Sequence, residues 1–154
     1  MKLDSLKNTS EFNLVNRAGI KYSCPDFMVI CMKDFSQEML KIFISKAQAK
    51  PGVDYSVILA SFKAANVYLG LKVSKKIGNA VKRNKVRRRV KTIVREMLKG
   101  AGREFLQGAG LIFIPRNNVS EVEFKTLSDE LNNAISYFQR KTKFNKKHIH
   151  ESNP

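Results

Sequence analysis

The stretch from residue 66 to residue 99 constrains the fold most, because its apolar side chains change from a two-residue to a 3.6-residue repeat. From Asn66 to Ser74 apolar residues alternate with others, which predicts a half-buried strand. A turn follows at Ile77-Gly78-Asn79. A helix is expected from there to Lys99, with two glycines just beyond it as stop signals. A strand joined directly to an amphipathic helix predicts that the helix packs on a sheet.

The predicted helix has two faces of opposite chemistry. Its apolar stripe, which must be packed on the sheet, consists of Val86, Val90, Ile93, Val94 and Met97. Its outer side carries a row formed by Asn84, Arg88, Lys91 and Arg95, with Arg87 beside it. Arg83 lies in line with the stripe at the helix start, where it can overhang the core. No acid occurs before Glu96 among eleven basic residues, which are Lys72, Lys75, Lys76, Lys82, Arg83, Lys85, Arg87, Arg88, Arg89, Lys91 and Arg95.

The charge of the whole chain indicates a polyanionic partner. Lys and Arg number 29 against 13 Asp and Glu, which gives a net charge of +16. Such an excess destabilises a compact chain by self-repulsion, so nucleic acid is the first candidate partner and an anionic membrane surface the second. Arginine presents a planar fork that matches phosphate oxygens, and the amides at the helix start, from Asn79 to Lys82, add to an anion site. These features do not choose between RNA and DNA.

The rest of the chain predicts further elements around this unit. A first helix is expected over residues 8–18, buried strands over Phe27–Met32 and Leu111–Ile114, and a last helix after a capping box formed by Ser120 and Glu123. Residues 34–65 could form extra strands or a short helix. The basic segment 141–154 is expected to be a disordered tail. The order of elements predicts a single α+β domain over residues 1–140, an α/β sandwich with a mixed sheet of about four strands and three helices.

Several classes of protein are disfavoured. The N-terminus lacks the apolar run of a signal peptide, and no segment approaches the ~20 apolar residues needed to cross a bilayer. Cys24 and Cys31 have no second pair with which to form a zinc site, and His148 and His150 lie in the polar tail. We therefore expect reduced thiols, a cytoplasmic location and no metal bound by this chain. No cluster of carboxylates or histidines points to a self-sufficient nuclease, so we expect no catalytic residues.

The run from Leu71 to Arg88 resembles the signature of the bacterial ribonuclease P protein. That family has a strand ending in Val-Ser-Lys-Lys, as at 73–76, and a Gly-Asn-Ala-Val turn, as at 78–81. An Arg-Asn-Arg motif then opens a basic helix, and here 83–85 read Arg-Asn-Lys. The likeness covers most of residues 6–140 outside the segment 34–65.

The resemblance implies a ribonucleoprotein that removes the 5′ leader of precursor transfer RNA. In that family the RNA subunit carries the chemistry with Mg²⁺, and the fold contains a left-handed βαβ crossover. The protein contacts the RNA subunit and the leader; no membrane and no obligate protein partner are expected. The implied RNA-contacting residues are Lys75, Lys76, Arg83, Asn84, Lys85, Arg87, Arg88, Lys91 and Arg95. The implied leader cleft, between the sheet and the first helix, contains Phe12, Val15 and Ile30.

Three features depart from the family pattern. Lys85 replaces an arginine, which keeps the charge but loses the bidentate geometry. Ile30 stands where the family often has an aromatic residue, and residues 34–65 are longer than the usual connection. The alternative function is a general or ribosome-associated RNA-binding protein, whose composition would look the same but which has no reason to share this order of residues.

Overall fold

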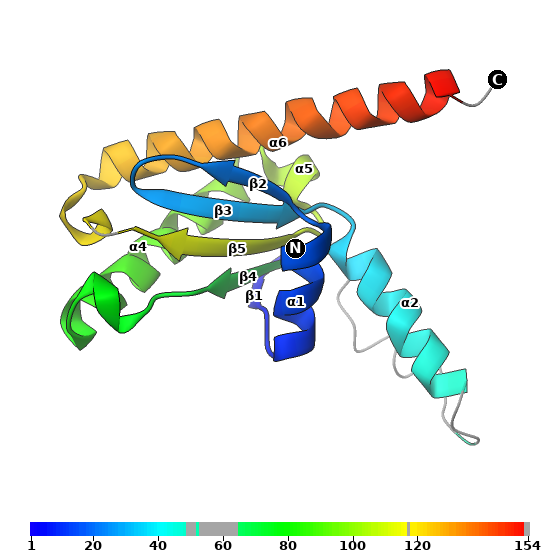
Figure 1. Ribbon diagram of the computed structural model, residues 1–154, viewed down its shortest axis with the longest axis horizontal. Helices are drawn as coiled ribbons and strands as arrows, with labels where there is room; N and C mark the ends of the chain where they lie inside the picture. Colours follow the sequence, from blue (N-terminus) through cyan, green and yellow to red (C-terminus); the bar gives the residue numbers. More distant parts are fainter. Residues whose placement is uncertain (49–51, 53–64, 117, 153–154) are drawn as a thin grey trace.

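A five-stranded mixed sheet forms the centre of the molecule (Figure 1). This computed structural model describes residues 1–48, 52, 65–116 and 118–152. The strands are β1 (Leu3–Ser5), β2 (Ile20–Ser23), β3 (Phe27–Met32), β4 (Val67–Leu71) and β5 (Gly110–Pro115). They lie in the order β1-β4-β5-β3-β2. Strands β1, β4 and β5 are parallel, whereas β3 is antiparallel to both β5 and β2. The predicted α+β class is confirmed, but the sheet has five strands where about four were expected, and β1 and β2 are strands that the sequence pattern did not reveal.

Helices cover both faces of the sheet (Figure 1). One face carries α1 (Thr9–Ala18) and α2 (Phe35–Gln48), and the other carries α4 (Ala80–Met97), α5 (Arg103–Leu106) and α6 (Phe124–Ser152). Two short 3₁₀ turns, η1 (Lys75–Ile77) and η2 (Val119–Glu121), precede α4 and α6. The sheet therefore separates two apolar cores, a large one beneath α4, α5 and α6 and a smaller one beneath α1 and α2.

The strands alternate between these two cores, because successive side chains of a strand point to opposite faces. In β3, Phe27, Val29 and Cys31 enter the large core, while Ile30 and Met32 enter the small one. The buried strand predicted from this apolar run is confirmed. The strand predicted from Asn66 is present as β4. The prediction that it is half-buried is wrong for its first half, because Tyr68 is also buried, at 7% exposure. Helices α1 and α2 cover the face that the alternation pattern assigned to solvent.

Helix α2 resolves part of the segment for which the sequence left two possibilities open. It begins directly after β3, and Phe35 and Met39 are buried in the small core. The helical alternative is therefore correct for residues 35–48. The remainder of the segment, apart from residues 52 and 65, lies outside the described residues.

Helix α6 confirms one prediction and corrects another. Four members of the apolar helical repeat expected after the capping box, Leu127, Leu131, Ile135 and Phe138, are buried, whereas its first member, Phe124, is 42% exposed. The capping box is wrong: Ser120 lies in η2 with 3% exposure, and the first helical bond runs from the Leu127 amide to the Glu123 carbonyl (3.0 Å).

The described helix also continues to Ser152, where a disordered tail was expected from residue 141. The four lysines from residue 141 to 152 favour helix, and the packed first half of α6 supplies the nucleus that an isolated segment lacks. None of the helices in the described ranges is both long and apolar enough to cross a membrane.

The connection from β4 to β5 carries the predicted basic helix. The two strands pair in parallel, with Gly70 opposite Ile112, and η1, α4 and α5 lie between them in the chain. This is the βαβ unit that the resemblance implied. Its left hand stays a prediction from the resemblance.

Candidate nucleic-acid interface

The start of α4 is fixed by a glycine and an asparagine. Gly78 has φ +143°, a conformation that side-chain-bearing residues rarely adopt, and a Cβ there would lie 2.8 Å from the Lys82 side chain. Asn79 is the N-cap: its Oδ1 accepts a hydrogen bond from the Lys82 amide at 3.0 Å. The predicted turn is confirmed. One of the amides expected to be free for an anion is already used by this cap.

The apolar stripe of α4 anchors the helix as predicted. Val86 and Val90 have no exposed surface, Ile93 and Val94 are 1% and 2% exposed, and Met97 is 6% exposed. With this side buried against the sheet and α6, the opposite side of α4 must face solvent.

The basic residues predicted to contact RNA lie on that opposite side and on η1. Lys75, Lys76, Arg88 and Arg95 are exposed, and Lys85, Arg87 and Lys91 are half-exposed. Arg87 Nη1 donates to Asn84 Oδ1 at 3.0 Å, which joins two members of the outer row. We define the α4 cationic face as the nine predicted residues, Lys75, Lys76, Arg83, Asn84, Lys85, Arg87, Arg88, Lys91 and Arg95.

No acid neutralises the α4 cationic face within the described part of the chain. The ion pairs there are Lys41–Glu38, Lys82–Glu121 and Lys99–Glu96, and none includes a member of the face. Arg83 is half-buried, and its Nε is buried without a hydrogen-bond partner among the described residues. A buried donor left unsatisfied costs about 1–3 kcal/mol, so an acceptor from a ligand would stabilise it.

Two basic residues of the same stretch have a structural role instead. Arg89 Nη1 donates to the Val122 carbonyl at 2.6 Å, and Lys82 Nζ lies 4.0 Å from Glu121 Oε1. Both contacts tie α4 to the segment around η2. Sequence spacing alone could not separate these two residues from their neighbours, because their partners are more than 30 positions away.

The three residues predicted to line a leader cleft differ in exposure: one is half-exposed and two are fully buried. Phe12 on α1 is half-exposed and lies over Gly70, where a Cβ would be 2.4 Å from the ring. Val15 and Ile30 have no exposed surface. Val15 faces the sheet from α1, and Ile30 lies on β3 beneath that helix. In this conformation neither residue offers a surface to a ligand.

The exposed surface beside Phe12 comes from residues that the sequence reasoning missed. Met28 and Ile114 are cross-strand partners, both half-exposed, on the side of the sheet that faces α1. Lys72 Nζ lies 5.8 Å from the centre of the Phe12 ring, within cation–π range. We name these four residues, Phe12, Met28, Lys72 and Ile114, the open sheet face. The strand register could have revealed it, because Met28 and Ile114 follow the same alternation as Ile30 and Ile112.

Helix α2 covers the part of this sheet side near the end of β3. The Phe35 ring lies 5.3 Å from that of Tyr68. A Cβ on Gly110 would meet both Phe35 and Val15 at 2.8 Å, so only glycine allows the two helices to approach β5 this closely. Helix α2, the described helical part of the segment 34–65, therefore fills an area of the sheet beside the open sheet face.

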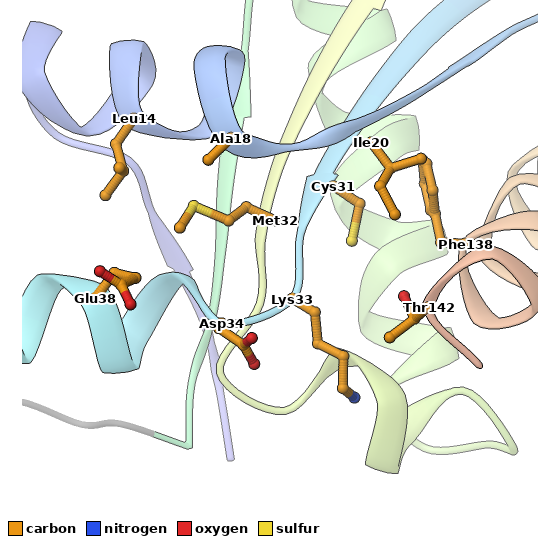
Figure 2. A pocket seen from close by; sticks show the side chains of 10 residues that line it. All are labelled: Leu14, Ala18, Ile20, Cys31, Met32, Lys33, Asp34, Glu38, Phe138 and Thr142. Carbon is orange, nitrogen blue, oxygen red and sulfur yellow. The ribbon is translucent and has the colours of Figure 1, made fainter. Parts of the chain in front are cut away.

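A separate cavity of about 490 Å³ opens between α1, α2 and α6 (Figure 2). Leu14 and Ala18 line it from α1, and Asp34 and Glu38 from the start of α2. Figure 2 shows the Lys33 side chain pointing away from Glu38 and toward α5, where its Nζ donates to the Phe105 carbonyl at 3.2 Å. With two carboxylates at its rim and its lysine engaged, this cavity does not suit a phosphate chain.

In the ranges that the structure describes, no three His, Cys, Asp or Glu side chains form a group that could hold a metal ion. Burial raises the pKa of the Cys31 thiol to about 12. Burial, together with a hydrogen bond and charge from Asp26, raises the pKa of Glu130, whose Oε2 lies 3.8 Å from Cys24 Sγ. Cys24 and Asp26 of the β2–β3 turn thus interact with Glu130 on α6.

Comparison with known proteins agrees with this arrangement. A family model described as Ribonuclease P matches residues 1–139. The ribonuclease P protein component of Rickettsia canadensis is 33% identical over 136 residues, which cover 88% of this chain and 97% of that protein. The Helicobacter pylori protein component is 36% identical over 126 residues, 80% of this chain and 70% of its relative.

A solved structure extends the likeness to the fold. The ribonuclease P protein from Thermotoga maritima superposes with a TM-score of 0.57 at 24% identity, covering 86% of this chain and 94% of that one. The family match spans nine-tenths of the sequence and includes α4, the open sheet face and the packed part of α6. The chain therefore belongs to the ribonuclease P protein family.

Proposed function

We propose that this ribonuclease P protein acts in the 5′ maturation of transfer RNA through two surfaces. The α4 cationic face binds phosphates of the ribonuclease P RNA subunit. The open sheet face holds the single-stranded 5′ leader of precursor transfer RNA. Family membership supports the role in leader removal, and the geometry of this chain supports the assignment of each surface.

The observation that carries the proposal is a rigid cationic surface without internal neutralisation. Helix α4 is fixed by its buried stripe, so its outer side chains keep their spacing along the surface. Each unpaired lysine or arginine that meets a phosphate releases a counterion, and this release drives binding to a polyanion. Arg83 adds a donor that lacks a partner in the described protein and that a phosphate oxygen would satisfy.

The open sheet face fits an unpaired strand of RNA. An aromatic ring such as Phe12 can stack on a base for about 1–3 kcal/mol, and this contact tolerates any base. Met28 and Ile114 extend the apolar surface, and Lys72 supplies a positive charge next to the ring. Val15 and Ile30, assigned to the cleft on the resemblance, support the surface from below.

The chemistry of hydrolysis belongs, in this proposal, to the RNA subunit. The carboxylates of the described chain serve helix starts, ion pairs and the Glu130 cluster, so Mg²⁺ would be held by the RNA. The chain's contribution is to bind, to orient and to screen phosphate charge. The free thiols of Cys24 and Cys31 fit a reducing cytoplasm.

Reconstitution with a bacterial ribonuclease P RNA at low Mg²⁺ tests the proposal. Addition of the chain should accelerate removal of the 5′ leader from precursor transfer RNA, because bound cations offset the repulsion that Mg²⁺ otherwise screens. An unrelated structured RNA of the same length, used as a binding competitor, should bind more weakly. Absence of acceleration together with equal affinity for both RNAs would favour the general RNA-binding alternative.

A further inference from the structure

Helix α6 is longer than the fold requires. Up to residue 143, where the described side chains of α6 end, the last buried apolar residue is Phe138, which has no exposed surface, and the family model ends at residue 139. The helix nevertheless continues to Ser152. At 1.5 Å per residue, the part from 140 to 152 adds about 20 Å. In Figure 1 this part, coloured orange to red, projects past the end of the sheet.

The extension carries almost only positive charge. Residues 140–152 contain five basic residues and one acid, Glu151; the basic residues are Arg140, Lys141, Lys143, Lys146 and Lys147. Arg140, Lys141 and Lys143 are exposed, and no ion pair of the described residues includes them. Lys141 Nζ lies 5.6 Å from the centre of the Tyr137 ring, one turn earlier on the same helix.

This charge pattern does not stabilise the helix by itself. Like charges three positions apart, such as those of Arg140 and Lys143, repel each other on a helix surface. The negative end of the helix dipole attracts cations only within the last turn. Arg140, Lys141 and Lys143 lie more than two turns before Ser152, so the dipole does not account for them.

We infer that the start of the α6 extension, with Arg140, Lys141 and Lys143, is a second RNA-binding surface outside the family match, and that it holds phosphates of the ribonuclease P RNA subunit. Helices α4 and α6 cover the same face of the sheet, whereas the open sheet face lies on the other side. Because α6 extends from the face of the sheet that α4 also covers, a large RNA that contacts α4 can continue along α6. The inference rests on the proposed function, because it takes the RNA subunit as the partner.

The test compares two double variants with the same change in charge. K141Q/K143Q removes two unpaired cations of the extension and keeps side chains that favour helix. K41Q/K99Q removes two exposed lysines that already pair with Glu38 and Glu96. Binding of the full-length chain to a bacterial ribonuclease P RNA is measured as a function of salt. Thermal unfolding of both variants verifies that they are folded.

For K141Q/K143Q, the slope of log K against log salt should become shallower by about 0.7–0.9 for each lost phosphate contact. Over a fourfold rise in salt, the Kd of the parent chain should then increase about tenfold more than that of the variant. K41Q/K99Q should keep the parental slope. Equal salt slopes for the two variants would overturn the inference. It would also be overturned if K141Q/K143Q changed only the affinity of the assembled enzyme for precursor transfer RNA.

Measurements on the parent chain distinguish failure of the α6 inference from failure of the proposed function. If the parent accelerates leader removal and only the α6 comparison shows no difference, the second surface is wrong and the proposed function stands. If the parent neither binds the RNA nor accelerates the reaction, the proposed function itself is wrong.

Discussion

At the scale of single residues, adjacent arginines on α4 have different roles. Arg88 is exposed on the outer row, whereas Arg89 donates to the Val122 carbonyl and is half-buried. The helical rotation of about 100° between neighbours separates a residue that faces solvent from one that faces η2. A count of basic residues therefore overstates the number available to RNA.

These two arginines provide a paired prediction. Arg88→Gln should weaken binding to the RNA subunit and reduce the salt slope by about 0.7–0.9, with unfolding unchanged. Arg89→Gln should lower the free energy of unfolding by about 1–3 kcal/mol, because the Val122 carbonyl loses a charged donor, and should leave the salt slope near the parental value. Urea denaturation and salt-dependent binding measure the two effects. Identical behaviour of the two variants would contradict the assignment.

Phe12 provides a second prediction. Phe12→Leu keeps an apolar side chain over Gly70 but removes the ring that can stack on a base. The preference of the assembled enzyme for precursor over mature transfer RNA should fall by about 1–3 kcal/mol. Phe124→Leu, at an exposed aromatic residue at the start of α6, is the matched control. An unchanged preference in Phe12→Leu would remove Phe12 from the leader site.

At the scale of elements, α2 covers the small core. Phe35 contacts Tyr68 and approaches β5 beside Val15 of α1. Phe35→Ala should therefore lower the free energy of unfolding by about 3–5 kcal/mol, the usual effect of removing a buried ring. Leu40→Ala on the same helix, at a half-exposed position, should have a clearly smaller effect in the same urea titration. Equal losses would show that α2 is not anchored through Phe35.

The contact between the β2–β3 turn and α6 predicts a dependence on pH. The pKa of Glu130 is raised by burial and by Asp26, so the folded protein binds this proton more tightly than the unfolded chain does. The stabilisation is complete below the unfolded pKa and is lost as pH rises through the raised value. Glu130→Gln should therefore be more stable than the parent near pH 7, and the difference should shrink toward pH 4.

The neighbouring carboxyl provides the control for this prediction. Asp129→Asn alters an exposed residue on the same helix. Thermal melts of both variants across this pH range measure the effect. A difference between Glu130→Gln and the parent that grows toward pH 4 would show that the sign is wrong.

At the scale of the whole molecule, the net charge of +16 acts on folding as well as on binding. Without RNA, the cations of α4 and of the α6 extension repel one another, and salt screens that repulsion over about 8–10 Å at 0.1–0.15 M. The melting temperature of the free chain should rise between low and moderate salt, while affinity for RNA falls over the same range. A melting temperature that falls with added salt would contradict this account.

The parts of the fold that the sequence predicted are those with a local repeat. The stripe from Val86 to Met97 and the alternation after Asn66 identified α4 and β4, since such repeats reflect a buried side. The pairing of β1 with β4 joins residues more than 60 positions apart, and three residues hold no recognisable period. The coverage of Tyr68 depends on α2, whose position no local pattern encodes.

The candidate site likewise contains residues that the sequence predicted correctly and residues that it misplaced or missed. The α4 cationic face followed from residue order and helical spacing, and its exposure agrees with that reasoning. Val15 and Ile30 were assigned to a cleft but are fully buried, because Val15 lies on the side of α1 that packs on the sheet and Ile30 lies on β3 beneath that helix. Met28 and Ile114 were missed because their exposure depends on where α1 ends relative to the sheet. Sequence patterns predict which side of a strand is apolar, and tertiary packing decides how much of that side stays open.

The central position of β5 has a consequence for how the chain folds during synthesis. Strand β5 pairs with β4 on one side and β3 on the other, so without it the sheet separates into β1–β4 and β2–β3. A ribosome must therefore translate residue 115 before the two halves can join. Until then, apolar strands that make up most of the sheet remain exposed to the growing chain's surroundings. Folding of this protein is thus a late event of its translation, and early termination would release an aggregation-prone fragment.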